Sequence, residues 1–325
     1  MKTIVFTLCS NNYLAHAKTL GDSLKSVSPN TEFIIGLVDE FNDQIDYSFF
    51  KPHQIIKYDQ IGFPFFKDMI AEYNIIEFNT SVKPYYMEFL LNKYGEGAKV
   101  YYIDPDIKMY AGLDHLNSIL DTSNIVVTPN LTEVPNEVDP GELASLRHGM
   151  FNLGFIGVSN TPETIRFLHW WQKRLRTHCI IDKSNGVFVD QKWVDFAPMY
   201  FKGTHVLKHK GYNMAWWNFS ERTLVNHNGK YVVNSPNEEL VFFHFSGYKP
   251  GSLSYTGRNN NSTDYALESR PELLDLFEDY HQLLLKNDFN KLSAIKPTIQ
   301  FAHGKKVVDS SLQNKLKMKV KKFLK

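Results

Sequence analysis

The sequence predicts an α/β protein built around a mostly parallel central sheet. Residues 4–8 form a short apolar run bounded by polar residues, and residues 14–24 carry apolar side chains at helical spacing. A second apolar run at 33–38 ends at Asp39 and completes a strand-helix-strand unit of the kind that builds parallel sheets. With 325 residues, of which 43% are hydrophobic and 22% charged, the chain has ample material for a folded core.

The next segments continue this alternation. Residues 82–94 are helical by pattern and meet a stop signal at Gly95. The apolar run 99–103 predicts another buried strand, which must finish at Pro105 because proline has no N–H to give to a strand ladder.

The second half of the chain adds two strands and two helices. Residues 152–158 and 241–245 have strand patterns, and residues 271–285 have an amphipathic helical one. Thr161-Pro162 predicts a helix start, with threonine as the N-cap and proline in the first turn. The buried stripe of this helix would consist of Ile165, Leu168, Trp171 and Leu175.

Charge and cysteine content exclude several classes of protein. Lysine and arginine number 36 against 35 acidic residues, so the surface as a whole does not track nucleic-acid phosphates. Cys9 and Cys179 lack the spacing of a metal site, which indicates a reducing compartment. No run reaches the roughly 18 apolar residues of a membrane span, and the N-terminal run is too short for a signal peptide. We therefore expect a cytoplasmic protein that binds no nucleic acid.

Two aspartates follow the buried strand at 99–103. Because alternate side chains of an extended chain point the same way, Asp104 and Asp106 converge on one point. A hard divalent cation would neutralise the pair and leave coordination positions free for a diphosphate. The alternative is a turn with two solvated aspartates. Since ligands of parallel sheets collect at the carboxyl ends of strands, Thr7 and Asp39 are further candidates for a pocket.

A histidine and a lysine follow the late strand at 241–245. His244 at a strand end can complete a metal site, Gly247 lets backbone approach a ligand, and Lys249 supplies a cation. The alternative is a partly buried histidine in an aromatic strand that leads into a Gly/Pro loop.

Three other segments carry polar side chains in informative places. Asp190-Gln191 precedes an apolar helix start, where helix capping is the alternative explanation. Asn152, flanked by small residues at a strand entrance, suits a sugar hydroxyl, and a bulge or edge turn is the alternative. The aromatic and amide residues of 211–218 suit an acceptor sugar, or they anchor a loop to the core.

Taken in chain order, these segments resemble the nucleotide-sugar-dependent glycosyltransferases of the GT-A fold, and most closely the retaining family 8 type. The resemblance covers about residues 3–250. The family's nucleotide loop and its DxD, FN-A/L-G, DQ and HxxGxxKP segments correspond in turn to residues 6–13, 104–106, 151–154, 190–191 and 244–250. Cys9 and Ser10 depart from the family, which usually has acidic residues in the nucleotide loop. Gly251 departs from the family's tryptophan after Lys-Pro.

The resemblance implies a role for each of these positions. Asp104, Asp106 and His244 would hold Mn²⁺ or Mg²⁺. Thr7 and Asp39 would help to bind the donor. The resemblance adds six further donor-binding residues, which are Asn12, Tyr13, Lys83, Asn152, Gly247 and Lys249. Asp190 and Gln191 would be the catalytic residues, with Gln191 near the anomeric carbon.

The implied activity is transfer of a sugar from a nucleotide-diphosphate sugar, expected to be a UDP-sugar, to a saccharide or lipid-linked saccharide. The reaction would proceed with retention and serve bacterial surface glycan synthesis. Three alternatives stay open. They are an inverting GT-A enzyme with Asp195 or Glu221 as base, an inactive GT-A scaffold that binds carbohydrate or a partner, and a metal-dependent phosphohydrolase, which would want more metal ligands.

The chain divides into one catalytic domain at 1–304 and a basic tail at 305–325. Within the domain, residues 1–110 would bind the nucleotide and 111–304 would complete the metal and acceptor sites. The tail holds eight lysines and one aspartate, so the rest of the chain is acidic. Segment 312–325 of the tail has an apolar stripe among lysines. This pattern predicts peripheral attachment to the anionic inner face of the cytoplasmic membrane. A helix packed on the acidic body or a solvated tail is the alternative, and the oligomeric state stays open.

Overall fold

A computed structural model describes residues 2–62, 64–227, 229–251, 254–256, 264–266 and 270–301. The basic tail at 305–325, including the predicted membrane-binding segment 312–325, lies outside the described residues. Within the part that is described, no helix is long and apolar enough to cross a bilayer.

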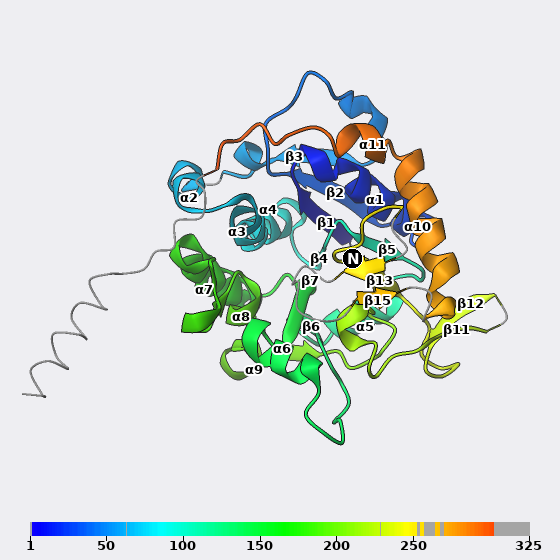
Figure 1. Cartoon of the computed structure of the whole chain (residues 1–325). Helices are drawn as coiled ribbons and strands as arrows, with labels where there is room; N and C mark the ends of the chain where they lie inside the picture. The colour runs from blue at the N-terminus through cyan, green and yellow to red at the C-terminus, as the bar shows by residue number, and fades with distance from the viewer. Residues whose placement is uncertain are drawn as a thin grey trace, which may run out of the picture.

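A seven-stranded sheet forms the centre of the fold (Figure 1). Its strands, in spatial order, are β10 (Thr204–Val206), β6 (Ile125–Pro129), β7 (Phe151–Ser159), β4 (Lys99–Ile103), β1 (Thr3–Cys9), β2 (Glu32–Leu37) and β3 (Gln54–Lys57). Every neighbouring pair is parallel except those made by β7, which runs antiparallel to both β4 and β6. The predicted α/β class with a mostly parallel sheet is confirmed.

Helices cover both faces of this sheet because its central strands are apolar on both sides. In β1, Phe6 and Leu8 pack with α4 (Lys83–Tyr94) and α7 (Pro162–His178). Val5, which points the other way, packs with α1 (Leu14–Val27) and α5 (Asp114–Leu120). Figure 1 shows α4 and α7 on one side of the sheet and α1 on the other.

Most predicted elements are confirmed to within a few residues. The N-cap at Thr161 is confirmed, since its side chain accepts a hydrogen bond from Thr164 N and Pro162 opens α7. Three of the four predicted stripe residues are buried, but Ile165 is only half-buried and Phe167 is fully buried in its place.

The apolar run at 241–245 is a strand for only three residues and lies outside the central sheet. These residues form β13 (Phe242–His244), which pairs antiparallel with β5 (Ile107–Met109). Backbone hydrogen bonds continue the pairing on either side, from Tyr110 N to Val241 O and from Phe245 N to Asp106 O. The pairing places His244 opposite Ile107, next to the predicted metal ligands.

The remaining elements surround this framework. The helices are α2 (Phe66–Glu72), α3 (Ile75–Ser81), α6 (Pro140–His148), α8 (Gln191–Val194), α9 (Ala197–Tyr200), α10 (Leu274–Lys286) and α11 (Phe289–Leu292). The small hairpins pair β8 (Ile181–Asp182) with β9 (Val187–Phe188), β11 (Leu224–His227) with β12 (Lys230–Val233), and β14 (Ser254–Thr256) with β15 (Asp264–Ala266). Helix α10 packs its apolar face on β13 and on α1. The prediction of one catalytic domain over 1–304 stays a prediction.

His16 on α1 makes the fold sensitive to acid. Its ring stacks on Tyr13 at 4.8 Å and meets Phe289 edge-on at 5.4 Å. Burial lowers the pKa of His16 from 6.5 to about 4, with Asp106 opposing the shift. Since the unfolded chain takes up this proton at a higher pH than the folded one, stability should fall by up to about 3 kcal/mol between pH 6.5 and pH 4.

The matching variant is His16→Phe, which keeps an aromatic ring and removes the titrating group. Urea unfolding at several pH values in this interval should show a shallower loss of stability for the variant than for the wild type. Equal slopes for the two proteins would contradict the assignment.

Candidate active site

Asp104, Asp106 and His244 converge between β4, β5 and β13. The Nε2 atom of His244 lies 3.1 Å from Asp106 Oδ1 and 3.6 Å from Asp104 Oδ2. One potential ligand atom from each residue lies within 4.8 Å of the others. The Asp106 and His244 side chains are 11% and 4% exposed, and that of Asp104 is 28% exposed. The structure therefore brings together the three residues predicted as metal ligands.

Backbone and ring contacts hold this cluster in place. Asp104 N donates to Gly154 O at 2.8 Å, which anchors the end of β4 to β7. A Cβ on Gly154 would lie 2.5 Å from His244 Cε1, so only glycine allows the imidazole this close to β7. Tyr102 donates its hydroxyl to Asp104 Oδ1 at 2.5 Å, and burial raises the pKa of Tyr102, which keeps that hydroxyl protonated.

The cluster fits a divalent cation. Two carboxylates and one imidazole give a mixed oxygen and nitrogen donor set, which suits Mn²⁺ and Mg²⁺ better than soft metals. Three protein ligands leave coordination positions free. A bound cation would relieve the repulsion between the two carboxylates.

Lys83 and Asp190 form a buried ion pair behind this cluster. Lys83 Nζ lies 2.8 Å from Asp190 Oδ2, and both side chains are 2% exposed. Lys83 Nζ also donates to Leu153 O at 2.7 Å and lies 4.2 Å from the Tyr102 ring centroid. Burial raises the pKa of Asp190, while Lys83 opposes the shift. The Asp190 side chain makes no capping hydrogen bond, so helix capping does not explain this residue.

Gln191 joins two segments through both ends of its amide. Its Oε1 accepts from Leu153 N at 3.1 Å, and its Nε2 donates to His148 O at 3.2 Å. Asn152, the predicted sugar-facing residue, is half-buried and accepts from Gly154 N at 3.0 Å. Gln191 and Asn152 thus flank Leu153 at the start of β7, on the strand that also carries Gly154.

The predicted nucleotide loop follows β1. Thr7 is fully buried, and its Oγ1 has no hydrogen-bond partner among the described residues. Asn12 and Tyr13 are half-buried, and Asn12 Oδ1 accepts from Ser10 Oγ at 2.8 Å. The end of β1 and the loop after it therefore offer a buried Thr7 hydroxyl with no hydrogen-bond partner among the described residues and two half-buried side chains, Asn12 and Tyr13.

Asp39 has a supporting position in the same region. Its carboxylate accepts from Asn11 N at 3.2 Å and from Asn11 Nδ2 at 2.9 Å. It also accepts from the backbone of Thr298 at 2.9 Å and of Ile299 at 3.1 Å. Asp39 therefore fixes the nucleotide loop and ties the segment after α11 to it.

Gly247 and Lys249 follow β13 in a turn. Gly247 has a positive φ of 81°, a conformation that favours glycine. Lys249 is exposed. The prediction that these two residues contact a diphosphate stays a prediction.

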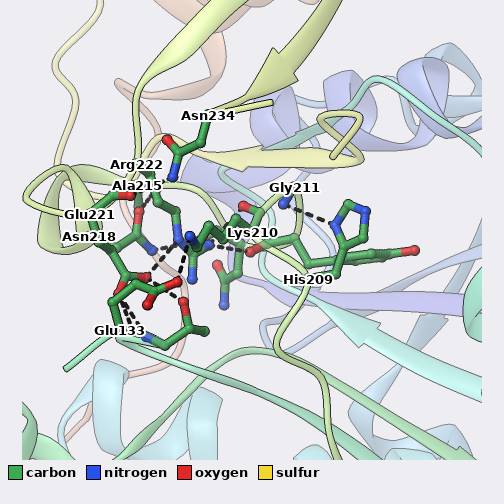
Figure 2. Close-up of polar contacts among 12 residues, drawn as sticks. Glu133, His209, Lys210, Gly211, Ala215, Asn218, Glu221, Arg222 and Asn234 are labelled. Carbon is green, nitrogen blue, oxygen red and sulfur yellow. Dashed lines mark hydrogen bonds and ion pairs between the residues drawn. The ribbon is translucent and has the colours of Figure 1, made fainter. Parts of the chain in front are cut away.

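The two residues considered as an inverting base are both engaged elsewhere. Glu221 accepts from Thr132 N and from Glu133 N, each at 2.8 Å, and pairs with Arg222 at 3.1 Å. Figure 2 shows Glu221 and Arg222 side by side in this network. Asp195 accepts from Met150 N at 2.7 Å and pairs with Lys192 at 2.9 Å. Both carboxylates hold loops together.

Sequence reasoning missed Asn213, which lies at the centre of the site. Its Oδ1 lies 3.1 Å from His244 Nδ1, and its Nδ2 lies 3.2 Å from Asn152 Oδ1. The segment 211–218 was predicted to line an acceptor cleft or to anchor a loop. The Trp217 ring lies edge-on to His244 at 5.1 Å, while Asn218 is fully buried and bonds to the backbone of its own loop. The amides of 211–218 predicted contacts with sugar hydroxyls, but no sequence signal pointed to the contact of Asn213 with His244.

Breaking the buried pair should be costly to stability. Lys83→Met leaves the Asp190 charge buried without its cation, which should lower the free energy of unfolding by about 3–5 kcal/mol in urea titrations. Lys230→Met is the control, since Lys230 pairs with Glu239 on the surface at 3.4 Å and should cost less than about 1 kcal/mol. The double variant Lys83→Met/Asp190→Asn should recover part of the loss. A cost for Lys83→Met no larger than the control's would refute the buried pair.

Comparison with known proteins connects this geometry to a fold. No protein-family model matches the chain. Two uncharacterized proteins of Bacillus subtilis (strain 168) are similar to it. YfnF is 24% identical over 221 residues, which make up 66% of this chain and 72% of YfnF. YfnD is 26% identical over 175 residues, which make up 53% of this chain, and the chain spans about half of YfnD (54%).

A solved structure gives the architecture. The apo form of the glycosyltransferase GlyE of Streptococcus pneumoniae TIGR4 superposes with a TM-score of 0.50 at 15% identity. The match covers 92% of this chain and 66% of the GlyE chain. The sheet has seven strands and is mostly parallel, and the superposition covers most of this chain. Both observations indicate the same fold: the chain has the GT-A fold found in glycosyltransferases.

Proposed function

We propose that the chain is a metal-dependent glycosyltransferase. It transfers a sugar from a nucleotide-diphosphate sugar to a saccharide or lipid-linked saccharide. The observation that carries the proposal is the convergence of Asp104, Asp106 and His244 at the carboxyl end of β4 in a GT-A fold. A divalent cation would neutralise the diphosphate, and this cluster is the site that we propose for it.

The residues around the cluster have distinct roles in this proposal. Asp104, Asp106 and His244 hold Mn²⁺ or Mg²⁺, which would stabilise the negative charge that develops on the departing diphosphate. Thr7, Asn12 and Tyr13 bind the nucleoside, for which uracil is the proposed base. Gly247 and Lys249 approach the diphosphate from the turn after β13, and the lysine adds a second cation.

Asn152 and Gln191 face the donor sugar. Asp190 is held by Lys83 in a buried pair, which makes it a poor nucleophile because attack would leave the lysine charge uncompensated. We therefore favour attack by the acceptor on the same face of the sugar from which the diphosphate departs. The bond from the anomeric carbon to the phosphate oxygen breaks, the bond to the acceptor oxygen forms, and the departing phosphate takes the acceptor proton.

Lys83 and Asp39 support this site rather than enter it. Lys83 orients Asp190 and the carbonyl of Leu153, and Asp39 fixes the nucleotide loop through Asn11. Asn213 and Trp217 lie against His244, which supports the proposal that the segment 211–218 lines the acceptor site.

Two other functions fit less well. An inverting enzyme needs a free carboxylate base, and both Glu221 and Asp195 are bonded to backbone N–H groups. A two-metal phosphohydrolase needs more ligands than the three that converge among the described residues. An inactive scaffold has no need to keep a converging Asp-Asp-His set. Membrane attachment through 312–325 and a role in surface glycan synthesis stay predictions.

Activity should require the metal site. Donor hydrolysis, measured by release of the nucleoside diphosphate from a panel of nucleotide sugars with Mn²⁺, should be abolished by EDTA. Asp106→Asn should lower it by at least about a hundredfold, because a metal ligand and a charge are lost together. Asp279→Asn is the control, since Asp279 pairs with Lys108 on the surface. Full activity in EDTA would overturn the metal assignment.

The transfer should proceed with retention. If Gln191 lies beside the anomeric carbon and no carboxylate base is free, an α-linked donor should yield an α-glycoside. The anomeric coupling constant in the NMR spectrum of the first-formed product measures this directly. A β-linked product would move the protein to the inverting class.

A further inference from the structure

Asn213 is the residue that connects the metal cluster to the sugar-facing part of the site. It is 1% exposed and comes from the loop after β10. Its Oδ1 lies 3.1 Å from His244 Nδ1. Its Nδ2 lies 3.0 Å from Thr128 Oγ1 and 3.2 Å from Asn152 Oδ1. One side chain thus contacts a predicted metal ligand and a predicted sugar ligand.

The donor and acceptor roles in this set are consistent. Thr128 Oγ1 and Asn152 Oδ1 both accept from the Asn213 amide nitrogen, which leaves its oxygen facing the imidazole. An oxygen at that place requires a proton on Nδ1 of His244. The Nε2 lone pair is then available at the point where Asp104 and Asp106 converge. We propose that Asn213 is a positioning residue that fixes the ring orientation and tautomer of His244 for metal binding.

The backbone at Asn213 is held in the conformation that this role needs. Its φ is 55°, in the left-handed region that asparagine and glycine tolerate better than other residues. Asn218 Nδ2 donates to Asn213 O at 3.0 Å, and His244 N donates to Met214 O at 2.9 Å. The loop is therefore tied directly to β13 beside the histidine it orients.

Thr128 fixes the other end of the amide. It is 1% exposed and lies where the register between β6 and β7 shifts, between Val127 and Pro129. This irregularity places the Thr128 hydroxyl where it meets the Asn213 amide. Partners that hold a metal-binding histidine in this way typically change metal affinity by 10–100-fold when removed.

The inference rests on the proposed metal site, and Mn²⁺ binding tests it without any transfer assay. The fraction of free Mn²⁺, measured by electron paramagnetic resonance during titration of the full chain, gives the Kd. Asn213→Gly removes the side chain while tolerating the positive φ, and should weaken Mn²⁺ binding by at least about tenfold. Asn213→Asp keeps an oxygen acceptor for His244 Nδ1. Its Kd for Mn²⁺ should be no more than about threefold higher than that of the wild type.

A matched control is available in the same chain. Asn234 has a φ of 62°, and its side chain donates to Glu221 O and accepts from Thr223 N, both outside the metal cluster. Asn234→Gly should leave the Mn²⁺ affinity unchanged. Thr128→Val is a second, milder variant that removes the hydroxyl which holds the Asn213 amide. It should weaken Mn²⁺ binding by a few-fold, which keeps the test decisive if Asn213→Gly does not fold.

Failure of the inference alone can be told apart from failure of the proposed function. Wild-type affinity in both Asn213→Gly and Thr128→Val would overturn the positioning role, as would an Asn213→Asp variant that binds as weakly as Asn213→Gly. A wild-type chain that binds no Mn²⁺ would overturn the inference together with the metal assignment. The variants could show the expected changes in Mn²⁺ affinity while the wild type hydrolyses none of the nucleotide sugars. That result would support the inference and count against the transferase proposal.

Discussion

The carboxylates of Asp104 and Asp106 lie side by side at the end of β4, and like charges so close repel unless a cation or a set of donors neutralises them. The surrounding structure makes this arrangement possible. The pairing of β13 with β5 carries His244 to the two aspartates, and Gly154 leaves room for its ring. Tyr102 and Asn213 supply fixed hydrogen bonds to Asp104 and to His244. A candidate set of metal ligands is therefore assembled from segments that are distant in the sequence.

Two other buried carboxylates, those of Asp190 and Asp39, are each neutralised or hydrogen-bonded by partners of their own. Lys83 and Asp190 neutralise each other, and Asp39 is surrounded by backbone and side-chain N–H donors. Such buried groups would be costly alone, so their partners fix the positions of three segments relative to one another. These are the start of β7, the nucleotide loop and the chain after α11. The Asp104, Asp106 and His244 cluster is the place where we propose that a further positive charge binds.

Much of this arrangement can be predicted from local sequence. The strands that carry Thr7 and Asp104 are short apolar runs that end at polar residues, and strand ends in a parallel sheet meet at one edge. The convergence of the proposed metal ligands Asp104, Asp106 and His244 is predictable because each follows or ends an apolar run and together they resemble a family pattern. The helix at Thr161 is predictable from its capping residues alone.

The remaining features depend on tertiary contacts that no local pattern encodes. The ion pair of Lys83 with Asp190 and the hydrogen bonds of Gln191 to Leu153 and His148 arise only when α8 packs with β7, α4 and α6. The run 241–245 has the composition of a central strand, but backbone bonds to Asp106 and Tyr110 place it in a separate ribbon. Asn213 lies in a loop whose composition indicates sugar contacts or loop anchoring, and its contact with His244 arises only in the folded chain.

The most direct test of the account is the position of the metal. Crystals grown with Mn²⁺ and a nucleoside diphosphate should give an anomalous difference peak at the manganese absorption edge. The account predicts one peak in contact with Asp104, Asp106 and His244, with the diphosphate on its open side. A diphosphate bound elsewhere, or a manganese peak that does not contact these three side chains, would contradict it.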